Sequence, residues 1–113
     1  MSAPPLRVLF VCSRNRLRSP TAEAVCAGWP GVEAVSAGTA PDAETRVSAD
    51  LLAWADLVVA MEGRHRRRLA AEFGPLLKSV RVVVLGVPDD YGFMDPALVR
   101  LLRQRLAGLL PAP

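Results

Sequence analysis

A continuous apolar segment near the start of the chain, 6–12 (LRVLFVC), constrains the fold more than any other feature. Only Arg7 interrupts it, so the segment lacks the alternation of a strand with one solvated face. It is typical of a central parallel strand that is covered on both faces. Parallel strands need long crossover connections, which are usually helices. The sequence therefore predicts an α/β fold in which strands and helices alternate.

The predicted elements fill one domain, residues 1–113. Strands are predicted at 6–12, 32–36, 56–61 and 80–85, and helices at 19–27, 47–53, 63–73 and 96–110. Sites in such sheets lie at the carboxyl ends of the strands. The loop after Cys12 and the loop after Leu85 should therefore lie at the same edge of the sheet.

Cys12 is followed by five residues and then by Arg18 and Ser19, a Cys-x5-Arg-Ser spacing. This spacing places a thiol at the end of a strand, then a tight loop, then a helix that should begin near Ser19 as its cap, with Pro20 in its first turn. Such a loop can turn its backbone N–H groups inward around an anion, and the same donors favour the nucleophilic thiolate. Arg18 can bind two phosphate oxygens with its planar guanidinium. The pattern indicates a phosphate-ester hydrolase that works through a cysteinyl-phosphate.

Other loop residues are expected to support this site. Asn15 is the residue best suited to a left-handed turn, and Ser19 can donate a hydrogen bond to the Cys12 thiolate. The alternatives are that Asn15 is an ordinary turn residue and Ser19 only a helix cap. The loop as a whole is expected to surround the phosphate with the backbone of Ser13, Arg14, Asn15, Arg16 and Leu17.

The stretch VLFVCSRNRLRSPTAEAV resembles the start of the low-molecular-weight protein tyrosine phosphatase family, whose loop reads Cys-x-x-Asn-x-x-Arg-Ser followed by Pro-x-Ala-Glu. Three later segments resemble family segments in the same order, namely 36–39 (SAGT), 56–61 (DLVVAM) and 88–92 (PDDYG). The resemblance covers nearly the whole chain. It implies a three-layer sandwich, with a four-stranded parallel sheet in the order 2-1-3-4 and helices on both faces.

Three carboxylates compete for the role of the general acid, which protonates the leaving oxygen and then activates water. The resemblance aligns Asp89 with the family's acid and Tyr91 with an aromatic residue that lines the family's pocket. The family has Pro directly after its acid, whereas this chain has Asp90, so Asp90 stays a candidate. Asp95 precedes Pro96 at the start of the last predicted helix, where the simplest role is that of a cap.

Further departures from the family bear on the substrate. Arg14 and Arg16 stand where the family commonly has small or apolar residues; they could bind a second phosphate or a polyanion, or simply point into solvent. Leu17 replaces the second thiol of many members, and Cys26 is expected in the core, so a protective disulfide is not expected. The chain is also short in regions that build the family's phosphotyrosine pocket. The basic run 64–68 (RHRRR) predicts a solvated helix face with His65 at the surface.

Two substrate classes follow from these observations. One is a phosphomonoester, with phosphotyrosine protein as the family default. The other is a nucleotide or RNA end, including a 2′,3′-cyclic phosphate opened by the same attack of Cys12. An arsenate reductase of related fold would need more cysteines for its electron relay. A non-catalytic phosphate- or RNA-binding module would not need the thiol.

Composition limits the partners and the compartment. No cofactor or metal is expected, because the chain has one His and no Cys/His cluster with ligand spacing. Two cysteines, no signal peptide and no apolar run of bilayer length favour a reducing cytoplasm and no membrane partner. The net charge of +3 suits a phosphorylated small molecule, protein or nucleic-acid end without identifying it. The sequence leaves the oligomeric state open.

Overall fold

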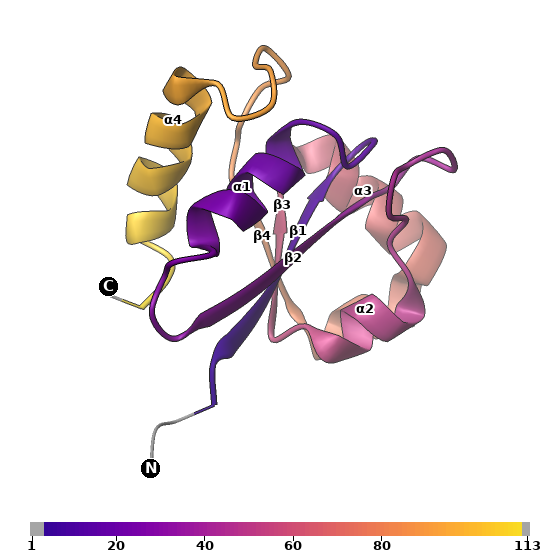
Figure 1. The fold of residues 1–113 in the computed structure, drawn as a ribbon. Helices are drawn as coiled ribbons and strands as arrows, with labels where there is room; N and C mark the ends of the chain where they lie inside the picture. The colour runs from indigo at the N-terminus through magenta and orange to yellow at the C-terminus, as the bar shows by residue number, and fades with distance from the viewer. Residues whose placement is uncertain (1–3, 112–113) are drawn as a thin grey trace.

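Strand β1 (Leu6–Cys12) lies inside a four-stranded parallel sheet in the computed structural model, which describes residues 4–111 (Figure 1). The other strands are β2 (Val32–Gly38), β3 (Leu57–Ala60) and β4 (Arg81–Val84). Their order is β2-β1-β3-β4, and all three pairings are parallel. The predicted sheet and its strand order are confirmed.

Helices cover both faces of this sheet, which gives the three layers that the resemblance implied (Figure 1). The layer on one face holds α1 (Arg18–Cys26) and α4 (Pro96–Ala107), and the layer on the other holds α2 (Ala49–Trp54) and α3 (Gly63–Phe73). Along β1, Val8 and Phe10 pack on the α1/α4 side, whereas Leu9 and Val11 pack on the α2/α3 side. All four are fully buried, which explains why the strand is apolar without alternation.

Several element boundaries differ from the predicted ones. Strand β2 continues to Gly38, and α1 begins at Arg18 with Leu17 as its N-cap, so the prediction that Ser19 caps this helix is wrong. Helix α2 starts after Ser48, whose hydroxyl accepts a hydrogen bond of 3.2 Å from the N–H of Leu51. A 3-10 helix, η1 (Gly74–Ser79), follows α3 and was not predicted.

Within residues 4–111, no helix combines the length and the apolar character that crossing a membrane requires.

Candidate active site

The loop between β1 and α1, residues 13–17, has backbone N–H groups that find no hydrogen-bond partner within residues 4–111. The carbonyls of residues 12–14 accept hydrogen bonds of 2.8–3.1 Å from the backbone N–H groups of Thr39, Ala40 and Glu44. Across the described part of the chain, no backbone N–H of residues 13–17 donates to another residue. The loop is therefore fixed through its carbonyls, and its donors stay available for an anion.

Two residues allow the loop to take this shape. Asn15 has a φ of 57°, the left-handed conformation expected of it. Gly38, at the end of β2, lies directly against the loop: a Cβ built there would be 2.5 Å from the carbonyl oxygen of Ser13 and 2.7 Å from the Cβ of Ala43. Any larger residue at position 38 would displace the loop, which gives a physical reason for the glycine of the 36–39 segment.

Cys12 lies at the base of this loop with its side chain 3% exposed. Its Sγ is 2.9 Å from the hydroxyl oxygen of Ser19, and the amide Nδ2 of Asn15 donates to the same oxygen at 3.1 Å. Because Asn15 occupies Ser19 Oγ as a donor, the hydroxyl proton is free to point at Cys12; the carbonyl of Ala37 is the longer alternative at 3.4 Å. These two contacts place a hydroxyl group that can donate beside the Cys12 sulfur.

Arg18 is buried, with 2% of its side chain exposed, and is held by three groups. Its Nη1 donates to Glu62 Oε1 at 2.5 Å and to the carbonyl of Val87 at 2.7 Å, and its Nε lies 3.6 Å from Asp89 Oδ1. Hydrogen bonds from Arg18 and then from Arg64 hold the pKa of Glu62 below its ordinary value. Within residues 4–111, Arg18 Nη2 has no hydrogen-bond partner, so this edge of the buried guanidinium is open for a ligand.

His65 is buried rather than exposed, so the prediction of a surface histidine is wrong. Only 1% of it is exposed, and it connects the phosphate loop to the start of α3. Its Nδ1 accepts a hydrogen bond of 3.1 Å from the N–H of Glu62, and its Nε2 lies 3.0 Å from Ser13 Oγ. Burial, and then the positive charges of Arg18 and Arg64, lower the pKa of His65 to about 4. The ring is therefore neutral at pH 7, with its proton on Nε2.

The three candidate acids occupy different places. Asp89 lines the cavity beside the phosphate loop and lies next to Arg18. Asp90 is exposed and is not part of this lining. Asp95 caps α4, since its Oδ1 accepts a hydrogen bond of 2.9 Å from the N–H of Ala97. The geometry thus brings Asp89 to the loop and gives Asp95 a structural contact.

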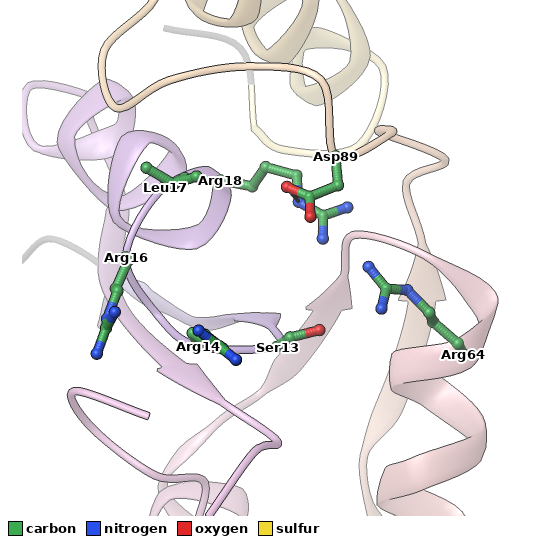
Figure 2. Close-up of a pocket in the computed structure, with 7 residues that line it drawn as sticks. All are labelled: Ser13, Arg14, Arg16, Leu17, Arg18, Arg64 and Asp89. Atoms are coloured by element: carbon green, nitrogen blue, oxygen red, sulfur yellow. Dashed lines mark ion pairs between the residues drawn. The ribbon is translucent and has the colours of Figure 1, made fainter. Parts of the chain in front are cut away.

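A cavity of about 480 Å³ opens over the loop (Figure 2). Most of the residues that line it come from the loop and the start of α1, and one each comes from α3 and from the segment after β4: Ser13, Arg14, Arg16, Leu17, Arg18, Arg64 and Asp89. Four of the seven are arginines. The cavity therefore presents cations and one carboxylate at the carboxyl ends of the strands.

Several solved structures share this fold. The YwlE arginine phosphatase from Geobacillus stearothermophilus is 25% identical, with a TM-score of 0.69 over 93% of this chain and 88% of that one. Wzb from Vibrio vulnificus, solved with benzylphosphonate, is 21% identical, with a TM-score of 0.72 over 90% and 94% of the two chains. A low-molecular-weight protein tyrosine phosphatase from Streptococcus pyogenes is 17% identical, with a TM-score of 0.72 over 93% of each chain. The chain has the fold of these phosphatases and resembles the low-molecular-weight protein tyrosine phosphatase family as a divergent, short member. No family model and no curated protein sequence matches it.

The neighbours of 25% and 26% identity are named as phosphatases, which supports the expectation of a cysteine-dependent phosphoric ester hydrolase. The chain departs from the family resemblance at Tyr91, which is half-buried against the core cluster of the α1/α4 side and is not among the cavity-lining residues. The position aligned with the family's pocket aromatic therefore does not line this cavity.

Cys26 behaves as the sequence predicts for a core residue. It is a free thiol with 1% exposure, and burial raises its pKa to about 11. A thiol that is buried and protonated is a poor nucleophile, so Cys26 is not expected to react with a substrate. Within residues 4–111, no group of three or more His, Cys, Asp or Glu side chains is placed to hold a metal ion.

Proposed function

We propose that this protein hydrolyses phosphomonoesters through a cysteinyl-phosphate on Cys12. The observation that carries the proposal is the position of the Cys12 thiol, which lies at the base of a loop whose N–H groups have no partner within residues 4–111. Binding a phosphate alone would need the donors but not a thiol with a hydroxyl donor beside it. The coincidence of the two favours covalent catalysis over a phosphate-binding module.

In the first step, the thiolate of Cys12 attacks phosphorus in line with the leaving group. The loop N–H groups and the open edge of Arg18 stabilise the charge on the non-bridging oxygens. The bond from phosphorus to the leaving atom breaks, and Asp89 transfers its proton to that atom. The products of this step are the free alcohol and cysteinyl-phosphate.

In the second step, a water molecule attacks the phosphorus of the intermediate. Asp89, now a carboxylate, accepts the proton of this water, and the sulfur–phosphorus bond breaks. Ser19 donates to the departing thiolate of Cys12, which lowers the barrier to its release. Inorganic phosphate then leaves, and the enzyme returns to its starting state.

The substrate classes differ in what the cavity offers them. Phosphotyrosine is the family default, and phosphoarginine is raised by the YwlE neighbours, which are named as arginine phosphatases. A nucleotide or RNA end, including a 2′,3′-cyclic phosphate opened by the same thiolate, is a second candidate. It is favoured by the four cavity arginines and by the lack of an aromatic residue among those that line the described cavity. Both cysteines are free, and this supports placing the enzyme in the reducing cytoplasm.

The test is hydrolysis by the purified protein, with EDTA present, of p-nitrophenyl phosphate, a phosphotyrosine peptide, a phosphoarginine protein and 2′,3′-cyclic nucleotides. Cys12→Ser should abolish turnover, whereas Cys26→Ala, a change to the buried thiol, should retain it. Preferential opening of the cyclic nucleotides would move the assignment to the second candidate. Turnover that survives in Cys12→Ser, or no turnover of any substrate, would refute the proposal.

A further inference from the structure

Arg64 lies next to the phosphate site although it comes from a different part of the chain. It belongs to the first turn of α3, and its side chain is 51% exposed. Its guanidinium lines the same cavity as Ser13 and Arg18, and Figure 2 shows it pointing from α3 toward the cavity. A substrate with its phosphoryl group in the loop would therefore have Arg64 beside it.

Arg18 and Arg64 bind the same carboxylate oxygen. Glu62 Oε1 accepts from Arg18 Nη1 at 2.5 Å, and from Nε and Nη2 of Arg64 at 3.2 and 3.0 Å. This shared oxygen places the two guanidinium groups side by side. Within residues 4–111, Arg18 Nη2 and Arg64 Nη1 make no hydrogen bond. Each arginine thus keeps one donor group for a ligand, and one carboxylate separates two positive charges.

The rest of the lining suits a charged substrate better than an aromatic one. Arg14 and Arg16 lie on the loop side, paired with Asp42 and Glu44 at 3.9 and 3.3 Å. All four of these side chains are more than half exposed, so water screens both pairs and a substrate anion can compete with them. Leu17 is the one apolar side chain among the residues that line the described cavity.

We propose that the preferred substrate is a small phosphomonoester with a second anionic group, and that Arg64 binds this second group. The inference rests on the proposed function and names its substrate class. The transferred phosphoryl group occupies the loop and the open edge of Arg18, and the second anion lies on Arg64. A carboxylate and a phosphate share the required chemistry, since both accept a charge-assisted hydrogen bond from a guanidinium.

The experiment compares kcat/KM for two isosteric esters, para-carboxyphenyl phosphate and its neutral partner para-carbamoylphenyl phosphate. A para-phosphonomethyl ester, measured against para-carbamoylmethylphenyl phosphate, distinguishes a phosphate-like second group from a carboxylate. We expect kcat/KM to be about tenfold higher for the anionic member of each pair, because one charge-assisted hydrogen bond contributes a free energy of this size. The preference should shrink as salt is added.

Three variants locate the second site. Arg64→Gln should remove the preference, and any indirect effect through Glu62 and Arg18 cancels because it lowers turnover of both esters. Arg68→Gln, one turn along α3 and outside the cavity lining, should leave the preference intact. Loss of the preference in Arg14→Gln but not in Arg64→Gln would overturn the placement on Arg64. Equal kcat/KM for both esters, with Cys12-dependent turnover, would overturn the inference and leave the proposed function standing; hydrolysis of neither would overturn both.

Discussion

Replacing His65 should change how the stability of the protein depends on pH. The neutral ring accepts the N–H of Glu62 with Nδ1 and contacts Ser13 with Nε2. Protonation would put a hydrogen on Nδ1, break the bond to Glu62, and add a positive charge beside Arg18 and Arg64. The carboxylates of Glu62 and Asp89 oppose this effect but do not outweigh it, since the pKa of His65 falls to about 4.

The sign and the size of the effect follow from linkage. In the unfolded chain the ordinary histidine pKa is 6.5, so between pH 6.5 and about 4 the unfolded state binds a proton that the folded state does not. The contribution of His65 is therefore complete above pH 6.5 and is lost as the pH falls toward 4. At about 1.4 kcal/mol for each pKa unit, the loss amounts to about 3 kcal/mol of unfolding free energy.

The assay is urea denaturation of the wild type and His65→Gln between pH 7.5 and 4.5. Glutamine can still donate to Ser13 but cannot titrate, so the wild type should be the more stable protein at neutral pH. The difference in unfolding free energy between the two proteins should be smaller at pH 4.5 than at pH 7.5 by about 2 kcal/mol. Carboxylates that do not contact His65, such as Asp56 with its lowered pKa, titrate in both proteins, so their effects on the unfolding free energy cancel in the comparison. A difference that stays constant across this pH range would show that the folded state does not disfavour the protonated imidazole.

Three further predictions concern the loops of the site. Asp89→Asn should lower kcat for phenyl phosphate by roughly 10²-fold or more, the usual effect of losing a general acid, whereas Asp90→Asn should have little effect; the reverse result would move the acid to Asp90. Gly38→Ala should destabilise the fold by about 1–3 kcal/mol in thermal unfolding and lower kcat, because the added Cβ would overlap the carbonyl of Ser13. Unchanged stability and unchanged kcat in this variant would refute the close packing of Gly38 on the loop. Thr21→Val should lower the free energy of unfolding by about 1–2 kcal/mol and should lower kcat more than it changes KM. The reason is that the Thr21 hydroxyl accepts a hydrogen bond from the N–H of Met94 at 3.0 Å and donates one to the carbonyl of Leu17 at 2.6 Å, so it joins the segment that carries Asp89 to the phosphate loop. Steady-state kinetics that show only a change in KM would contradict this role.

The sequence predicted the parts of the fold that depend on local patterns. The apolar run of β1 and the alternation of elements led to the α/β class, and the family resemblance supplied the strand order. The five-residue gap between Cys12 and Arg18 predicted the loop, and the left-handed turn of Asn15 is present. These features are encoded over short spans of chain, which is why they could be found without the structure.

The parts that could not be predicted depend on contacts between distant segments. His65 lies in a run of arginines, and nothing in that run shows which residue faces the phosphate loop. The capping box it forms with Glu62 reverses the usual signature, in which a small hydroxyl residue precedes an acidic one. For Ser19 the sequence suggested both a contact with Cys12 and a helix cap. In the structure α1 starts one residue earlier, so the cap is absent and the expected contact with Cys12 is present.

The most direct test of the account is to find the phosphoryl group on the enzyme. The leaving group of p-nitrophenyl phosphate needs little protonation, so Asp89→Asn should still form the intermediate while lacking the base for its hydrolysis. Stopping this variant during turnover at neutral pH, followed by peptide mass spectrometry, should show a phosphoryl group on Cys12 and none on Cys26. Unmodified Cys12 in both the variant and the wild type, with activity retained in Cys12→Ser, would contradict the account.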